Sequence, residues 1–125
     1  MKLMNLFRKK MPNIIMILID GGGREDALNQ VPFYKELKSE STFFSNLIPY
    51  APYTIGAMNS LFSGIDGNRN GVNGYYKSHS FDVKNICTLP QYLKDSGYYT
   101  ELDFVIEEVV PAQGFDKVRI FGKDT

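Results

Sequence analysis

An unbroken apolar run at residues 14–19, which ends at Asp20, constrains the fold of this chain more than any other feature of its sequence. A strand with one face in water alternates apolar and polar residues, whereas a continuous apolar run is typical of a parallel strand covered on both faces. Three glycines at 21–23 follow the aspartate and end the strand. The run therefore predicts a central strand of an α/β sheet. Its six residues are too few for a membrane span or for the apolar part of a signal peptide.

Helical and extended patterns alternate along the rest of the chain. Pro32 and the apolar residues after it predict a helix at 33–37, and a β-prone stretch predicts a strand at 42–48. Elements that alternate in this way predict a mostly parallel sheet flanked by helices, which is an α/β fold. The further predicted elements are a helix at 54–64, a long loop at 65–85, a helix at 88–97, and strands at 98–104 and 118–121.

Length and charge exclude several classes of function. The 125 residues suit a single domain. The 14 basic and 14 acidic residues leave no net charge, so we expect neither a nucleic-acid partner nor an anionic membrane surface. Four of the basic residues lie in an N-terminal basic segment at 1–11. No signal peptide is predicted, and the single cysteine, Cys87, can form neither an internal disulfide nor a zinc site, so we expect a cytoplasmic protein.

Asp20 is the first candidate for chemistry. In open α/β sheets the ligand site lies beyond the carboxyl ends of the strands, and Asp20 places a carboxylate there. A hard oxygen at that place suits a divalent cation. A turn former or a helix cap is the alternative interpretation. The glycines at 21–23 leave room for a phosphate, although Asp26 stands where a dinucleotide-binding fingerprint requires its third glycine.

Thr54 is the second candidate, at the predicted N-terminus of the helix at 54–64. Apolar residues at helical spacing follow it, and Gly64 stands where a left-handed terminator belongs. Capping of the helix is one interpretation of this threonine. The other is a nucleophile, because a helix N-terminus offers N–H groups and a partial positive charge to an anionic phosphoryl group.

An ordered set of motifs resembles the N-terminal half of the alkaline phosphatase–sulfatase superfamily, over about residues 12–121. The nucleophile of that superfamily is followed six residues later by serine and ten residues later by glycine, which is the spacing of Thr54, Ser60 and Gly64. The other motifs are the strand that ends at Asp20, Gly71-Val72 preceded by Asn70 where the family has histidine, the segment at 88–100, and Gly114-Phe115-Asp116.

This resemblance implies a fold and a chemistry. Residues 12–125 would form the N-terminal part of an alkaline phosphatase-like catalytic domain. Asp20 resembles the first aspartate ligand of the family's metal centre, and Thr54 resembles the nucleophile, which also contacts the metal. The expected cofactors are divalent ions: zinc, manganese, calcium or magnesium. The expected reaction is attack by Thr54 on phosphorus, followed by hydrolysis of the phospho-threonine.

Departures from the family pattern favour phosphate esters as substrates, with sulfate esters as the lesser expectation. Sulfatases that carry formylglycine resemble Cys- or Ser-x-Pro-x-Arg at the nucleophile, and residues 54–58 lack the convertible residue, the proline and the arginine. Gly21 replaces the second residue of their Asp-Asp pair. The chain is therefore more similar to the threonine-nucleophile phosphodiesterase and phosphoglycerol-transferase branches.

Asn73 and Arg24 are candidates for contact with the substrate. Asn73 resembles a phosphoryl-binding asparagine of the nucleotide pyrophosphatase/phosphodiesterase branch, and a loop asparagine at a turn is the alternative. Arg24 pairs either with a substrate anion or with a surface carboxylate such as Glu25. Four tyrosines flank the predicted site and either line it or pack there, namely Tyr50, Tyr53, Tyr75 and Tyr76.

The family completes its metal centre with aspartates and histidines from its C-terminal half, and this sequence lacks them. We therefore expect an N-terminal fragment that is inactive alone, with the C-terminal half of the catalytic domain as its missing partner. One alternative is a non-catalytic α/β module that binds phosphate or a nucleotide through the glycines at 21–23. The other is a pseudoenzyme that acts as an interaction domain through its sheet edge.

Overall fold

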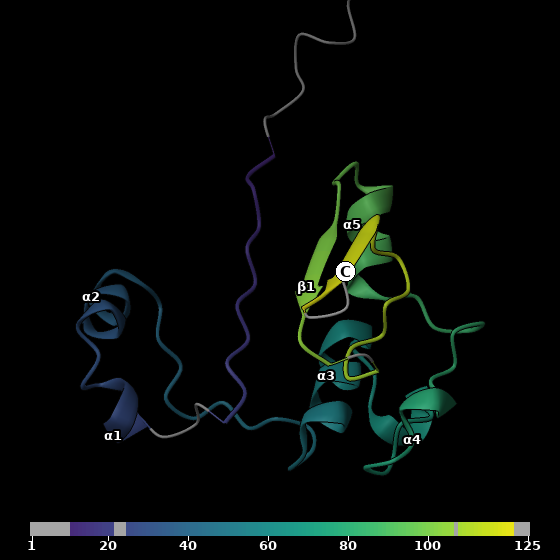
Figure 1. Cartoon of the computed structure of the whole chain (residues 1–125), viewed down its shortest axis with the longest axis horizontal. Helices are drawn as coiled ribbons and strands as arrows, with labels where there is room; N and C mark the ends of the chain where they lie inside the picture. Colours follow the sequence, from purple (N-terminus) through teal and green to yellow (C-terminus); the bar gives the residue numbers. More distant parts are fainter. Residues whose placement is uncertain (1–10, 22–24, 107, 122–125) are drawn as a thin grey trace, which may run out of the picture. The chain divides into compact units, whose positions relative to one another are not determined.

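A computed structural model describes residues 11–21, 25–106 and 108–121 (Figure 1). Contacts between residues divide the chain into two compact units, Met1–Phe43 and Phe44–Thr125. Arg24, predicted to contact the substrate, lies outside the described residues. Within the described ranges, no helix combines the length and the apolar character that a membrane span requires.

The first unit contains two described helices, α1 (Glu25–Leu28) and α2 (Pro32–Glu40). Pro32 opens α2, where its missing N–H costs no intrahelical hydrogen bond. Val31 before it is extended, with φ −86° and ψ 118°, as the residue before a proline prefers. The helix predicted at 33–37 is confirmed, and it continues to the end of α2.

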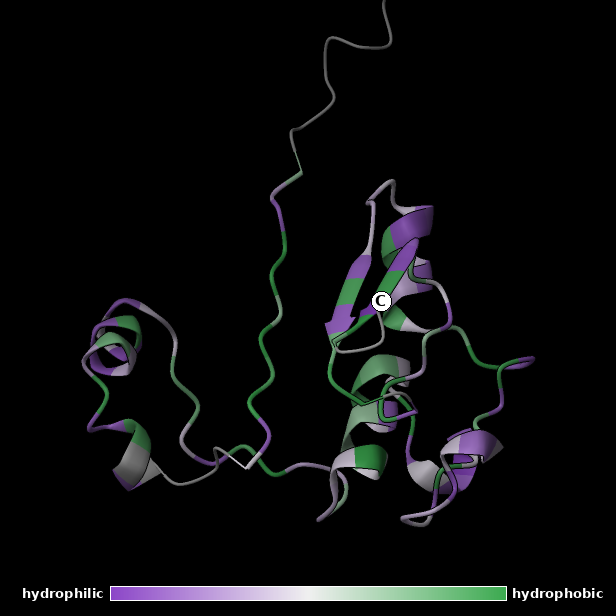
Figure 2. Ribbon diagram, viewed as in Figure 1, coloured by the Kyte–Doolittle hydropathy of each residue, from purple (hydrophilic) through white to green (hydrophobic). Residues whose placement is uncertain are grey.

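The structure corrects the strand predicted at residues 14–19. These residues have no helix or strand, and their side chains are exposed, Ile15 by 84% and Ile17 by 79%. Figure 2 shows the hydrophobic colour that recurs along this trace. The strand predicted at 42–48 is wrong too, because residues 45–46 form a turn. A strand needs a neighbour for its backbone N–H and C=O groups, and within the described ranges neither segment pairs with one.

The second unit contains the remaining helices and a parallel sheet. In chain order the elements are α3 (Thr54–Ser63), α4 (Gly67–Asn70), the 3₁₀ helix η1 (Ser78–Ser80), α5 (Leu89–Asp95), β1 (Glu101–Phe104) and β2 (Lys117–Ile120). Strands β1 and β2 pair in parallel, with Glu101 opposite Lys117 and Phe104 opposite Ile120. This pair confirms both predicted C-terminal strands and their parallel direction. The long loop predicted at 65–85 is wrong in part, because α4 and η1 lie within it.

The apolar core of the second unit is small. Its buried members are Val72, Phe81 and Ile86, and Ile55 and Ile65 pack against them. These side chains come from α3 and from the segments around α4 and η1. The core therefore joins α3 to the residues that follow it, at 65–86.

Asn70 is fully buried and joins three segments of the second unit. Its Nδ2 donates to the Ile65 carbonyl at 3.0 Å and to Ser63 Oγ at 3.4 Å, while its Oδ1 accepts the Val72 N–H at 2.8 Å. The next residue, Gly71, has φ +92°, and a Cβ there would lie 2.1 Å from the Ser80 carbonyl oxygen. The asparagine that replaces the family's histidine therefore holds the scaffold, beside a glycine that no larger residue can replace.

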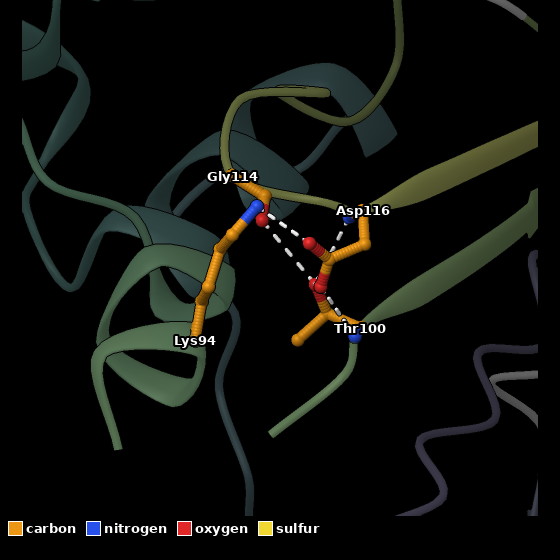
Figure 3. Close-up of polar contacts among 4 residues, drawn as sticks. All are labelled: Lys94, Thr100, Gly114 and Asp116. Carbon is orange, nitrogen blue, oxygen red and sulfur yellow. Dashed lines mark hydrogen bonds and ion pairs between the residues drawn. The ribbon is translucent and has the colours of Figure 1, made fainter. Parts of the chain in front are cut away.

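Thr100 and Asp116 connect α5 to the strand pair (Figure 3). Asp116 Oδ2 accepts the Thr100 N–H at 2.9 Å and its hydroxyl at 3.1 Å, while Asp116 Oδ1 pairs with Lys94 Nζ at 2.5 Å. The Thr100 hydroxyl also lies 3.2 Å from the Gly114 carbonyl. Lys94 belongs to α5, Thr100 precedes β1 and Asp116 precedes β2. Two family-like motifs, far apart in sequence, thus bind each other.

Asn70→Ala should lower the free energy of unfolding by about 1–3 kcal/mol, because the buried Val72 N–H and Ile65 carbonyl lose a partner. The measurement is urea unfolding of the 125-residue chain. The matched control is Asn73→Ala, an exposed asparagine three residues later, whose effect should stay within about 0.5 kcal/mol. Equal losses in the two variants would contradict the scaffold role of Asn70.

Asp116→Asn should weaken the dependence of stability on acid. Lys94, and then the Thr100 backbone N–H, hold the pKa of Asp116 below its ordinary value. A depressed native pKa stabilises the fold above the unfolded pKa of about 4, and this contribution is lost as the pH falls through the native pKa. Asparagine keeps the shape of the side chain but cannot titrate. The free energy of unfolding of the variant should therefore fall less than that of the wild type between about pH 5 and pH 2.

Urea unfolding at a series of pH values measures this effect. The matched control is Asp95→Asn, at an exposed residue that ends α5. That variant should keep the acid dependence of the wild type. If the free energy of unfolding of Asp116→Asn falls with acid as steeply as that of the wild type, the proposed contribution of Asp116 to acid sensitivity is refuted.

Candidate functional site

Thr54 is the first residue of α3 and is half-buried. The N-cap is Tyr53, which is extended at φ −140° and ψ 149° and makes no side-chain capping hydrogen bond. The interpretation of Thr54 as the N-cap is therefore wrong by one position, because the backbone turns helical only after Tyr53. Gly64 is the left-handed C-cap at φ 67°, as predicted. The structure thus places the candidate nucleophile within the first turn of a ten-residue helix.

A close contact holds the start of α3. Gly56 is buried, and a Cβ there would lie 2.6 Å from Tyr53 Cε2 and 2.8 Å from the Ala51 Cβ. Only a residue without a side chain lets the Tyr53 ring lie against the first turn. The glycine two residues after Thr54 therefore leaves the space that the Tyr53 ring occupies.

The electrostatics of the first turn favour an anion. The N-terminal end of an α-helix has a partial positive charge, and its N–H groups point out of the helix. The first turn of α3, all of which the structure describes, contains no acidic residue. The partial positive charge of the helix would therefore attract an anionic group near Thr54, and no carboxylate of that turn would repel it.

Further along α3, side chains anchor the helix to the rest of the unit. Asn59 Nδ2 donates to the Ile55 carbonyl at 2.8 Å and to the Val109 carbonyl at 3.3 Å, and Ser63 Oγ donates to the Asn59 carbonyl at 2.6 Å. Ser60 Oγ, at the family-like spacing from Thr54, is buried and finds no hydrogen-bond partner in the described part of the chain. Neither Asn59 nor Ser63 was singled out from the sequence, because polar residues inside a helix give no local signal of a distant partner.

Asp20, the candidate metal ligand, follows the apolar run of the first unit. Its Oδ1 accepts the Gly21 N–H at 3.1 Å, and Gly21 has φ +69° with no atom within 4 Å of the place of a Cβ. Thr54 belongs to the second unit, so the structure does not define a shared site for Asp20 and Thr54. The donor types do fit a hard divalent cation, since both are oxygens. Among the described residues, no group of three or more His, Cys, Asp or Glu side chains gathers at a metal-ligand distance.

Asn73, the candidate substrate-binding residue, is exposed and lies in the same unit as Thr54. Lys77 Nζ donates to Asn73 Oδ1 at 3.1 Å, and Asn73 Nδ2 donates to Asn68 Oδ1 at 3.4 Å. These contacts give Asn73 a place in a polar surface cluster. Its contact with a substrate stays a prediction.

Three of the four flanking tyrosines contact one another. The ring centroids of Tyr53 and Tyr75 are 5.8 Å apart, and those of Tyr75 and Tyr76 are 5.1 Å apart with an interplanar angle of 74°. The tyrosine that caps α3 is thus the first member of a chain of rings. Lys77, which follows Tyr76, adds a cation to this loop.

Comparison with known proteins agrees with the resemblance of the sequence motifs to the sulfatases. The sulfatase family model matches residues 12–124. No curated protein and no solved structure matches the chain. The match spans both the apolar run that ends at Asp20 and the second unit, and the parallel strand pair suits the expected α/β fold of the alkaline phosphatase type. The chain belongs to the sulfatase family.

Proposed function

We propose that this protein contributes the nucleophile of a metal-dependent hydrolase or transferase that acts on phosphate esters, with sulfate esters as the lesser expectation. The observation that carries the proposal is the position of Thr54 as the first residue of α3 in a member of the sulfatase family. That family supports hydrolase chemistry in general. The threonine, the metal and the phosphate preference are the proposed part.

The field of α3 supports an anionic substrate at Thr54. A phosphoryl group beside the first turn of a helix meets a partial positive charge and N–H donors, and this turn has no acidic residue. The Thr54 hydroxyl belongs to the same turn. Substrate anion and nucleophile are therefore held by one element, which reduces the entropy cost of bringing them together.

The proposed reaction is an in-line displacement at phosphorus. Thr54 Oγ1 forms a bond to phosphorus while the bond from phosphorus to the ester oxygen breaks, and the hydroxyl proton leaves to solvent. The departing alcohol takes up a proton. Water then attacks the phosphorus of the phosphorylated threonine, which restores the hydroxyl and releases inorganic phosphate from a monoester substrate or a phosphate monoester from a diester substrate. With an alcohol as the acceptor in place of water, the same steps describe a transferase.

Asp20 and Thr54 are the residues of this chain that would hold a divalent ion. When bound, such an ion lowers the pKa of a coordinated hydroxyl and neutralises charge on the phosphoryl oxygens. Zinc, manganese, calcium and magnesium all remain candidates, because carboxylate and hydroxyl oxygens suit each of them. Two donors are too few for a tight site, so we propose that further ligands complete it. The cytoplasmic location likewise stays a prediction.

The packing of Gly56 argues against the formylglycine reaction of other family members. Their pattern has proline two residues after the nucleophile. Here the Tyr53 ring lies 2.6 Å from the place that a side-chain carbon of residue 56 would occupy. A proline would displace that ring. The absence of that proline supports the proposal that Thr54 acts without conversion to formylglycine.

In a protein that joins these residues to the expected C-terminal half of the catalytic domain, Thr54→Ala should reduce metal-dependent turnover of bis(p-nitrophenyl) phosphate about a thousandfold or more, because the nucleophile is removed. Thr54→Ser keeps a hydroxyl and should retain part of the activity. The matched control is Thr42→Ala, at an exposed threonine of the first unit. Release of p-nitrophenolate measures the rates, and mass spectrometry of acid-quenched protein should find a p-nitrophenyl phosphoryl group on Thr54.

Turnover that persists in Thr54→Ala, or that phosphoryl group on another residue, would contradict the nucleophile. Removal of metal by a chelator should abolish turnover, and added metal should restore it. Phosphate or nucleotide that binds without metal, and equally well to Asp20→Asn, would favour the non-catalytic binding module instead.

A further inference from the structure

Asparagine is followed by glycine at two places in the sequence, Asn70-Gly71 and Asn73-Gly74. Asparagine is a chemically labile residue, because the backbone nitrogen that follows it can attack its side-chain amide carbon and form a cyclic imide. A glycine at that nitrogen favours the attack, since it has no β-carbon and restricts the backbone least. The structure places the two asparagines in opposite environments.

Asn70 is held in a geometry that prevents this reaction. It is fully buried, and its Nδ2 donates to the Ile65 carbonyl at 3.0 Å while its Oδ1 accepts the Val72 N–H at 2.8 Å. The Gly71 N–H, which would have to attack, donates to the Gly67 carbonyl at 3.1 Å. Both reacting groups of this pair are therefore engaged within the fold.

Asn73 lies under none of these restraints. It is exposed and belongs to no helix or strand. The Gly74 N–H has no hydrogen-bond acceptor within the described ranges of the chain. The partners of the Asn73 amide are two exposed side chains, Asn68 at 3.4 Å and Lys77 at 3.1 Å, which water can replace. The amide carbon and the attacking nitrogen of this pair are therefore able to meet in the folded protein.

Lys77 favours attack on the Asn73 amide. Its ammonium donates to Asn73 Oδ1, the oxygen that gains negative charge when a nitrogen adds to the amide carbon. A cationic donor at that oxygen stabilises the developing charge. The Lys77 N–H donates to the Gly74 carbonyl at 3.1 Å, so the turn itself keeps this cation close to the reacting pair.

We propose that Asn73 is a site of spontaneous deamidation, with the Gly74 backbone nitrogen as the attacking group. This nitrogen forms a bond to Asn73 Cγ while the bond from Cγ to Nδ2 breaks, and ammonia leaves with the proton that the Gly74 nitrogen gives up. Water then opens the cyclic imide and returns a proton to the nitrogen. Opening at Cγ gives aspartate, and opening at the backbone carbonyl carbon gives isoaspartate.

The product differs from Asn73 in charge and in backbone path. Residue 73 gains a carboxylate, with which the Lys77 ammonium can form an exposed ion pair. Isoaspartate also adds one carbon atom to the main chain. Asn73 is the candidate substrate contact, so a converted chain would present a negative charge to an anionic substrate there.

Incubation of the native 125-residue chain at about pH 8, followed by mass spectrometry of its peptides, tests the proposal. Each converted residue gains about 1 Da, because OH replaces NH₂. Asn73 should convert at least about tenfold faster than Asn70, since Asn70 reacts only when the fold opens locally. Asn70 is the matched internal control, because in guanidinium chloride the unfolded chain should convert both asparagines at similar rates.

Gly74→Ala tests the attacking nitrogen. A Cβ at this position would lie 3.6 Å from Lys77 Cδ, which is an ordinary contact, so the fold accepts alanine there. Conversion of Asn73 should slow several-fold, while the circular dichroism spectrum stays that of the wild type. Isoaspartate should accompany aspartate in the wild type, because the imide gives both products and direct hydrolysis of the amide gives aspartate alone.

Four results would overturn the inference. They are equal rates at Asn73 and Asn70 in the native chain, an intact Asn73 once the unfolded chain has converted, aspartate without isoaspartate, and an unchanged rate in Gly74→Ala. None of these measurements involves Thr54 or a metal ion. The proposed function and this modification therefore stand or fall separately.

Discussion

Hydrogen bonds from buried side chains to backbone groups are the interaction on which the second unit depends. Its apolar core has few members, and the side chains that are fully buried include Asn59, Asn70 and Thr88 as well as Val72. Asn59 and Thr88 join segments that are distant in sequence, and Asn70 joins the end of α3 to the residues that follow α4. Thr88 Oγ1, for example, donates to the Gln113 carbonyl at 2.7 Å, and Gln113 Nε2 donates to the Ile86 carbonyl at 2.6 Å. Such bonds specify one arrangement, because a shifted partner would leave a buried polar group unpaired.

The family-like motifs divide into scaffold and candidate chemistry. Lys94, Thr100, Gly114 and Asp116 come from two motifs and meet in one network before the strand pair (Figure 3). Their contacts give these residues a structural role in the second unit. Thr54 differs, since it starts a helix without acting as its cap. Most residues of these motifs therefore indicate the fold, and only a few of them are candidates for the chemistry.

Local signals in the sequence were sufficient to predict features that depend only on neighbouring residues, such as helix ends. The helix after Thr88 was predictable from its capping residue, and the structure adds the reciprocal bond from the Thr88 N–H to Gln91 Oε1 at 2.8 Å. The end of α3 was predictable from Gly64 for the same reason. The start of α3 was misplaced by one residue, because the N-cap is Tyr53, which makes no side-chain capping hydrogen bond and whose ring lies against Gly56. Packing of that kind leaves no trace in residue spacing.

The two C-terminal strands and their parallel direction were predictable, but the absence of a partner among the described residues for the N-terminal segments at 14–19 and 42–48 was not. The apolar run at 14–19 has the composition of a buried strand, yet strand formation depends on a neighbour that composition does not reveal. The candidate site has the same difficulty, since Asp20 and Thr54 were linked through a family pattern and not through a measurable contact. The contacts among Tyr53, Tyr75 and Tyr76 were likewise visible only once the loop after α4 had a defined path.

The exposed run at 14–19 also matters for how the protein behaves before its fold is complete. It combines six apolar, mostly β-branched residues with no charge and no proline, which is the composition that promotes aggregation through cross-strand stacking. The sequence places charges at both sides of it: Arg8, Lys9 and Lys10 before the run, and Asp20 directly after it. Such flanking charges act as gatekeepers, because stacking the run in register would also stack like charges. Asp20 would thus protect the nascent chain from self-association, whatever it binds in the folded protein.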